Sequence, residues 1–337
     1  MLTYLQAIVI ALVQGVTELF PVSSLGHSVL VPAWFGGSWE TLVTQSSQAN
    51  SEASFYLAFI VALHVATALA LLWFFRADWA RIANGFLHSV PRSLRERRLS
   101  AADPDERLAW LIVLATIPVG LTGVAFEHAF RTVFAKPVAA SALLLINGLI
   151  LFAGERARRR SEERPPSPAE VPVGALVGAG EPEGPSLPEG KTGGGRTAQD
   201  LAAAYASDVR ISRLPYLQGL LIGSFQILAL FAGISRSGVT MVGGLWRGLS
   251  HEDAARFAFL LATPVILAAG VLKVPTLFGQ AGEHIHGQIA VGFLVTGVAA
   301  YLSVRFLVRY FETHTLKPFA IYCVAFGGLS LVRFAAF

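Results

Sequence analysis

Six long apolar stretches dominate the pattern of hydrophobic and polar positions along the chain. Each is close to the roughly 20 residues that an α-helix needs to cross the hydrocarbon core of a membrane. They cover residues 55–75, 109–126, 137–153, 257–275, 288–304 and 318–336. The pattern therefore predicts six transmembrane helices in an all-α polytopic membrane protein.

Two further apolar stretches, residues 2–30 and 214–249, are interrupted near their centres by small, polar and helix-breaking residues. The interruptions read FPVSS at residues 20–24 and AGISRS at residues 232–237. Because such residues end helices, each stretch is expected to form a pair of half-helices instead of one continuous span.

The two interrupted stretches also resemble each other. A shift of 212 positions aligns Gln14 with Gln226 and Ser23 with Ser235, among others. Each half of the chain then contains one re-entrant half-helix pair and three transmembrane helices. Since three is an odd number, the second half is upside down relative to the first, and the sequence predicts an inverted repeat.

A polar segment separates the two halves. It begins with an arginine-rich run and continues with a run rich in Pro, Gly and Glu. Such a composition cannot bury enough apolar surface to fold. We therefore predict a first membrane repeat at 1–155, a disordered cytoplasmic linker at 156–213 and a second, inverted membrane repeat at 214–337, the two repeats forming one membrane domain.

Composition and charge agree with this class. The chain is 54% hydrophobic and only 14% charged, whereas a soluble globular protein carries about 25% charged residues. The net charge is +4, and 16 of the 26 basic residues lie in two segments, 76–107 and 155–213. This distribution is typical of cytoplasmic loops, places the N-terminus and residues 31–53 on the outer side, and indicates no nucleic-acid partner.

The first interrupted stretch carries candidate chemistry. Glu18 lies within an apolar segment, where an ionisable side chain costs at least ~2.5 kcal/mol unless it faces a partner or a wet cavity. Gln14 lies four residues earlier on the same helical face. Ser23 and Ser24 can cap the second half-helix, and His27 follows one turn later. The alternative is that the serines serve only as caps and that His27 only packs.

The second interrupted stretch carries a cation. Arg236 follows Gly233 and lies between Ser235 and Ser237, with Thr240 one turn further. A guanidinium group beside the free N–H groups of a helix N-terminus, flanked by hydroxyls, is suited to hold phosphate. The alternative is a structural ion pair between this arginine and the carboxylate of the first stretch.

The two interruptions resemble the signatures of a known family. QGVTELFPVSSLGH at residues 14–27 and AGISRSGVT at residues 232–240 are similar to the two motifs of the bacterial undecaprenyl-pyrophosphate phosphatase family, the bacitracin-resistance type. The resemblance covers about 1–155 and 214–337. Two positions matter for the comparison: Ala232 replaces the proline of the second motif, and Gln14 is an accepted alternative that supplies no charge.

The resemblance implies hydrolysis of undecaprenyl pyrophosphate to undecaprenyl phosphate and inorganic phosphate. This reaction recycles the lipid carrier for peptidoglycan synthesis and confers bacitracin resistance. The resemblance also implies a multi-pass protein of the bacterial plasma (inner) membrane, surrounded by lipid, with an active site that opens to the outer, periplasmic face. A homodimer is compatible with the sequence but not required by it.

The same resemblance assigns roles to residues. It implies catalytic Glu18, Ser24, His27 and Arg236, and a divalent cation, Mg²⁺ or Ca²⁺, bound at Glu18. It implies pyrophosphate binding by Gln14, Ser23, Gly233, Ser235, Arg236, Ser237 and Thr240. We expect Ser24 to be the nucleophile, Glu18 its base, and His27 the group that protonates the leaving phosphate or orients the site. His27 as nucleophile and a metal-activated water are the alternatives.

A polyprenyl-phosphate transporter or flippase is the main alternative function. Inverted repeats with broken helices are typical of secondary transporters, and a phosphate cradle could carry a lipid phosphate without cleaving it. The hydroxyl, carboxylate and imidazole groups opposite an arginine favour the hydrolase, because transport does not require them. The predicted site residues recognise the pyrophosphate group and not the length of the prenyl chain, so pyrophosphates with shorter prenyl chains also fit this site.

Overall fold

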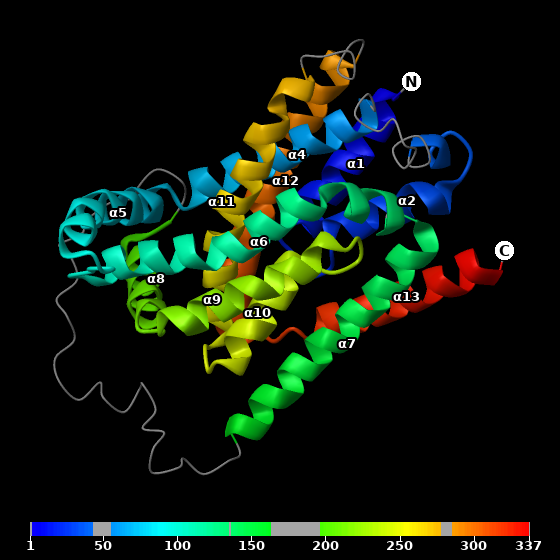
Figure 1. The fold of residues 1–337 in the computed structure, drawn as a ribbon. Helices are drawn as coiled ribbons and strands as arrows, with labels where there is room; N and C mark the ends of the chain where they lie inside the picture. The colour runs from blue at the N-terminus through cyan, green and yellow to red at the C-terminus, as the bar shows by residue number, and fades with distance from the viewer. Residues whose placement is uncertain (1, 43–54, 135, 163–195, 278–284, 337) are drawn as a thin grey trace.

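The computed structural model describes residues 2–42, 55–134, 136–162, 196–277 and 285–336, and the regular elements in these ranges are helices (Figure 1). In chain order they are α1 (Tyr4–Thr17), α2 (Ser24–Phe35), α4 (Phe55–Phe74), α5 (Arg76–Glu96), α6 (Pro104–Phe134), α7 (Pro137–Glu162), α8 (Ala198–Ser212), α9 (Tyr216–Ser224), the 3₁₀-helix η2 (Phe225–Leu230), α10 (Arg236–Trp246), α11 (His251–Leu277), α12 (His286–Thr313) and α13 (Lys317–Ala336).

The six uninterrupted apolar stretches all form long helices, as predicted. Five of them, α6, α7, α11, α12 and α13, contain segments long and apolar enough to cross a membrane. The sixth, α4, meets the test together with α5, to which it is joined by a bend of 86°. Leu121, Leu294 and Leu329 are among many apolar side chains that these helices leave exposed. Such surfaces suit contact with lipid, so the chain is an all-helical polytopic membrane protein.

Both interrupted stretches are broken helices, as predicted. In the first, α1 ends at Thr17 and α2 begins at Ser24. In the second, α9 and η2 end at Leu230 and α10 begins at Arg236. The turns need unusual backbone geometry, with φ of 71° at Ser23 and 119° at Gly233.

The two turns lie against each other. The backbone N–H of Gly233 donates to Ser23 Oγ over 3.2 Å, and a Cβ added to Gly26 would lie 2.9 Å from the Cα of Gly233. Ser235 Oγ donates to the carbonyl oxygen of Phe20 over 3.4 Å. Glycine at residues 26 and 233 therefore permits the close approach of the two motifs.

Asn147, in the middle of α7, connects both turns. Its Nδ2 donates to the carbonyl oxygen of Pro21 over 3.1 Å, and its Oδ1 accepts from the N–H of Ser235 over 2.9 Å. The side chain is fully buried. One amide thus satisfies a buried backbone group in each motif.

Replacing Asn147 by alanine is expected to lower the free energy of unfolding by about 2 kcal/mol, because a buried carbonyl and a buried N–H lose their partner. Thermal unfolding of the detergent-solubilised protein measures this effect. Asn84→Ala, at an exposed position of α5, is the matched control. Equal stability of the two variants would contradict a connecting role for Asn147.

Helices from the two halves pack against each other throughout. α1 packs on α12 and α9 on α6, while α4 packs on α11 and α12. α7 and α13 lie side by side along much of their length (Figure 1). The helix α10 packs between α7 and α11. The two motif turns are therefore held inside the molecule by helices of both halves.

Helices lie where the sequence predicted a loop and a disordered linker. α5 occupies most of the basic segment 76–107, and α7 and α8 occupy the two ends of the segment 156–213. The middle of that segment, 163–195, lies outside the described residues. The prediction of disorder is thus wrong for α8, because the average composition of the segment concealed a short helix with its own capping box at Thr197 and Asp200.

Ion pairs hold α8 against the membrane helices. Asp208 accepts from Arg81 and Arg256, both over 2.7 Å, and Arg256 also donates to Asp78 over 2.9 Å. Burial disfavours the charged form of Asp78, but the guanidinium groups of Arg256 and Arg196 outweigh it and lower the pKa of this carboxyl to about 2. These arginines therefore help to fix α5, α8 and α11 to one another.

Candidate active site

Glu18 is the centre of the site and lies in the turn that follows α1. Its Oε2 accepts from Gln14 Nε2 over 3.0 Å and from the hydroxyl of Ser24. Its Oε1 lies 3.9 Å from Nη2 of Arg236, which begins α10. Only 4% of the Glu18 side chain is exposed. The structure thus brings together four residues that the sequence had selected from two motifs 200 positions apart.

The contact between Ser24 and Glu18 has the geometry of a nucleophile and its base. Ser24 is the first residue of α2, and its hydroxyl donates directly to the carboxylate. A serine hydroxyl is a weak nucleophile until an adjacent base takes its proton. Both side chains are buried, with 7% of each residue exposed, so little water competes for this hydrogen bond.

Arg236 has an unused donor. Its Nη1 is buried and has no hydrogen-bond partner within the described residues. A buried polar group without a partner is costly and is rare in folded proteins. Because the nitrogen belongs to a cation at the N-terminus of α10, an anionic ligand is the partner that best satisfies it.

The other predicted phosphate-binding groups act mainly on the turns themselves. Ser23 Oγ accepts from the N–H of Gly26, and Ser235 Oγ accepts from the N–H of Gly238, each over 3.2 Å. Ser237 Oγ lies 3.1 Å from Ser235 Oγ.

Thr240 Oγ1 donates to the carbonyl oxygen of Arg236 over 2.8 Å, and Gly233 has a backbone conformation that favours glycine. In this structure the side chains of Ser23, Ser235 and Thr240 therefore stabilise the backbone of the two motifs. Contact of these groups with phosphate stays a prediction.

His27 is turned away from the carboxylate. Its Nδ1 lies 2.7 Å from the carbonyl oxygen of Ser23, and its Nε2 lies 2.7 Å from the hydroxyl of Tyr322 in α13. The ring stacks on Tyr322 and Phe326. Since a carbonyl oxygen can only accept, Nδ1 donates and Nε2 accepts from the tyrosine. The structure therefore does not place the His27 ring beside Glu18, as the sequence led us to expect. Its contacts match the alternative in which His27 is a packing residue.

A different histidine contacts the carboxylate. Nε2 of His64, in α4, lies 3.3 Å from Glu18 Oε2. This residue lies within the apolar stretch 55–75 and was not among the predicted site residues. One signal was present, since an ionisable side chain in the middle of a membrane helix marks a functional site by default.

The residues at this site suit a divalent cation only in part. No group of three or more potential metal-binding side chains occurs among the described residues. Glu18 Oε1 lies 3.9 Å from Nη2 of Arg236, beside the N-terminus of α10. A single carboxylate is an ordinary protein contribution for Mg²⁺ when substrate phosphates and waters supply the remaining ligands.

An apolar groove lies between α1 and α12, beside the first motif. Its volume is about 670 Å³, and it is lined almost entirely by apolar side chains. Phe20, two residues after Glu18, lines it, and Phe306 stacks on this ring with centroids 5.9 Å apart. Val16 and Val298 lie along the groove and are exposed. The groove can therefore take a hydrocarbon chain whose polar end reaches the motifs.

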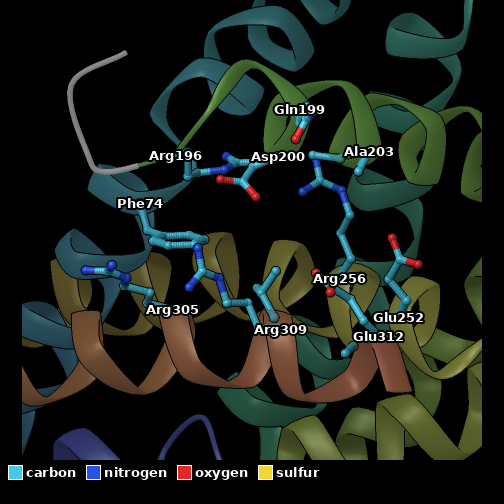
Figure 2. Close-up of a pocket in the computed structure, with 13 residues that line it drawn as sticks. Phe74, Arg196, Gln199, Asp200, Ala203, Glu252, Arg256, Arg305, Arg309 and Glu312 are labelled. Carbon is cyan, nitrogen blue, oxygen red and sulfur yellow. The ribbon is translucent and has the colours of Figure 1, made fainter. Parts of the chain in front are cut away.

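A second cavity, of about 430 Å³, is lined by residues of α8, α11 and α12. Figure 2 shows Asp200 entering it from α8, and Arg305 and Arg309 from α12. Arg256, in its wall, is already paired with two carboxylates. No residue of the two motifs lines this cavity, so it lies apart from the candidate chemistry.

Comparisons with known proteins agree with these motifs. The family model described as bacitracin resistance protein BacA matches residues 7–181 and 194–329. Undecaprenyl-diphosphatase 2 of Frankia alni is 58% identical over 99% of this chain and 98% of its own length. Undecaprenyl-diphosphatases of Mycolicibacterium paratuberculosis and Mycobacterium avium are 55% and 54% identical over the same shares. The chain therefore belongs to the BacA family of bacitracin resistance proteins.

Proposed function

We propose that this protein is an undecaprenyl-diphosphatase. It hydrolyses undecaprenyl pyrophosphate to undecaprenyl phosphate and inorganic phosphate, which recycles the lipid carrier for peptidoglycan synthesis and confers resistance to bacitracin. The observation that carries the proposal is the serine hydroxyl of Ser24 donating to the buried carboxylate of Glu18, close to Arg236, whose Nη1 has no hydrogen-bond partner in the described part of the chain. The names of three close relatives point to the same reaction.

The reaction follows from these three side chains. Glu18 takes the proton of Ser24 as Oγ attacks the terminal phosphorus, and the bond from that phosphorus to the bridging oxygen breaks. Undecaprenyl phosphate leaves with the bonding electrons, and the phosphoryl group stays on Ser24. The proton on Glu18 passes to the departing undecaprenyl phosphate, which frees the carboxylate to act as a base again. Glu18 then deprotonates a water that attacks the phosphoserine, and the bond from phosphorus to the serine oxygen breaks. The serine oxygen takes the proton back from Glu18, and inorganic phosphate is released. Arg236 and the N-terminus of α10 stabilise the charge on the transferred group.

The geometry favours Ser24 over His27 as the nucleophile. Both ring nitrogens of His27 are within hydrogen-bond distance of other groups, and its ring is packed on α13. Attack by a water activated at a metal ion is the remaining alternative. It differs from the serine route in forming no covalent phosphoserine.

A divalent cation, Mg²⁺ or Ca²⁺, is part of the proposal, with Glu18 Oε1 as its protein ligand. When bound, such an ion neutralises pyrophosphate oxygens. Removing it with a chelator is expected to lower the rate of phosphate release by ~10³-fold, equivalent to several kcal/mol. Adding either ion back is expected to restore the rate. The residual rate of Glu18→Gln should no longer respond to the ion, and an unchanged wild-type rate in chelator would contradict the cation site.

The groove between α1 and α12 is proposed to hold the prenyl chain. Filling it with Val298→Trp is expected to raise the KM for undecaprenyl pyrophosphate ~10-fold, because about two methylene groups lose their contacts. Hydrolysis of a pyrophosphate with a short prenyl chain should change little. Val332→Trp, at an exposed position of α13, is the control. Equal KM values for the two variants would contradict this position of the chain.

The inverted repeat is also a proposal. If α1, α4, α6 and α7 correspond to α9, α11, α12 and α13, then the packing of α1 on α12 has its counterpart in the packing of α9 on α6. The pairs α4 with α11 and α7 with α13 map onto themselves. Such exchange is what a two-fold axis in the membrane plane produces, and it supports re-entrant half-helix pairs in both halves.

Location and sidedness follow from charge. The basic helix α5, and α8 with Arg196 and Arg213 at its two ends, belong to the side with most arginines, which we assign to the cytoplasm of a bacterium. A first half-helix pair that re-enters from the opposite side would open the active site of this plasma-membrane (inner-membrane) protein to the periplasm. A homodimer stays a prediction.

Reconstitution separates hydrolysis from transport. Protein in liposomes is supplied with undecaprenyl pyrophosphate, and inorganic phosphate and the leaflet of the lipid are both measured. We expect phosphate release at a rate that depends on Ser24. Movement of the lipid between leaflets without phosphate release would favour the flippase and would contradict the hydrolase.

A further inference from the structure

The Glu18 carboxylate is also contacted by His64, which lies in α4, a helix that carries neither motif. Its Nε2 faces Glu18 Oε2 at 3.3 Å, and its Nδ1 lies 2.9 Å from the carbonyl oxygen of Ile60 one turn earlier in α4. The carbonyl can only accept, so Nδ1 donates to it and the orientation of the ring is fixed; Nε2 donates to the carboxylate when the ring is the doubly protonated imidazolium, in which both nitrogens are donors. Only 16% of the side chain is exposed. The ring therefore presents Nε2 to the carboxylate from a rigid support.

The two oxygens of Glu18 have different surroundings. Oε2 has Gln14, Ser24 and His64 around it, contributed by α1, α2 and α4. Oε1 lies 3.9 Å from Arg236, which is beyond the distance of a hydrogen bond. The carboxylate is thus held by its Oε2 beside the serine and is not hydrogen-bonded to the guanidinium group of Arg236.

This arrangement needs an explanation, because a buried carboxylate and a buried guanidinium normally form direct, often bidentate, hydrogen bonds. If Glu18 turned to Arg236, Ser24 would lose its base. At the same time Arg236 would lose the free donor that can bind phosphate. Something must oppose this collapse, and His64 is the group placed to do so, since it contacts Oε2 whereas Arg236 approaches Oε1.

We propose that His64 is the positioning residue of the active site: it holds Glu18 on Ser24 and apart from Arg236, so that the base stays with the nucleophile and the guanidinium stays available for the phosphoryl group. The inference rests on the proposed hydrolase function and deepens it. His64 acts through Glu18 and makes no contact with substrate in this role.

Two substitutions separate positioning from packing. His64→Leu keeps an apolar side chain in an apolar helix but removes the donor, whereas His64→Gln keeps a polar N–H group of similar reach. A packing residue would tolerate leucine at least as well as glutamine. Positioning predicts the opposite order, with kcat/KM reduced ~10- to 100-fold in His64→Leu and within a few-fold of wild type in His64→Gln, as for other residues that orient a reacting group.

A double substitution tests the route through Glu18. In the Glu18→Gln background the neutral amide is no longer attracted to Arg236, so His64→Leu should lower the residual rate little further. A full, multiplicative effect of His64→Leu in that background would overturn the inference. Equal rates of wild type and His64→Leu would also overturn it, while leaving the proposed hydrolase function intact.

An experimental structure of His64→Leu gives a readout that does not depend on activity. We expect the Glu18 carboxylate to form direct hydrogen bonds with Arg236 and to leave Ser24. A carboxylate that stays on Ser24 would overturn the inference even if the protein were not a hydrolase. Should His64→Leu fail to give monodisperse protein, His64→Met, which also lacks the donor, takes its place in both experiments.

Discussion

Replacing Ser24 by alanine is expected to lower kcat for phosphate release from undecaprenyl pyrophosphate by ~10⁴-fold or more, with a much smaller change in KM. The substitution removes the oxygen that attacks phosphorus and leaves the base and the arginine in place. Loss of a nucleophile in comparable serine hydrolases has effects of this size or larger. The measurement is a steady-state assay of phosphate release by purified protein in detergent.

Ser28 offers a matched control, one turn further along α2. It is also buried, and its hydroxyl has no hydrogen-bond partner among the described residues. Ser28→Ala should therefore keep nearly the full rate. If Ser24→Ala retained more than a tenth of the wild-type rate, Ser24 would not be the nucleophile. His27 and a metal-activated water would then have to be tested in turn.

Replacing Arg236 by alanine is expected to lower kcat/KM by ~10³-fold or more. An arginine that stabilises the transferred phosphoryl group in other phosphoryl-transfer enzymes contributes 10³- to 10⁵-fold. Arg236→Lys should recover only part of this loss, because an ammonium group is a point charge and cannot donate in the planar, two-pronged geometry of guanidinium. Steady-state rates over a range of substrate concentrations separate the effects on kcat and KM.

Arg247, at the other end of α10, is the control for this prediction. It is exposed and follows the last turn of the helix, so Arg247→Ala removes the same charge without touching the site. Equal losses for the two variants would mean that the overall charge of the protein matters and not the position of the guanidinium. That result would contradict Arg236 as the phosphate-binding cation.

The membrane helices were predictable because each buries or exposes apolar side chains over a length set by the bilayer. The broken helices were predictable for a related reason, since Pro21 and Gly233 interrupt otherwise apolar runs. The helices α5 and α8 were missed. Their stability comes from ion pairs such as Asp208 with Arg256, between residues 48 positions apart, and no local pattern reveals such partners.

The candidate site was only partly predictable. Gln14 and Glu18 share one helical face, so their contact follows from local spacing. The approach of Arg236 to Glu18 was suggested by the paired motifs. Asn147 and His64 were not found, because each is a single polar residue in an apolar span and acquires its partner only in the tertiary structure.

His27 illustrates a different limit of sequence analysis. Its position one turn after Ser24 is compatible with the active site, yet its ring is directed to α13 by hydrogen bonds to Ser23 and Tyr322. Spacing along a helix specifies a face of that helix, but not which of the neighbouring groups a side chain contacts.

The most direct test of the central claim is phosphate release from undecaprenyl pyrophosphate by purified wild-type protein, compared with Glu18→Gln under the same conditions with Mg²⁺ present. Glutamine keeps the size of the side chain but removes the base. We expect release by the wild type and a rate ~10²- to 10⁴-fold lower in the variant. Folded wild-type protein that releases no phosphate, or a Glu18→Gln variant as fast as the wild type, would contradict it.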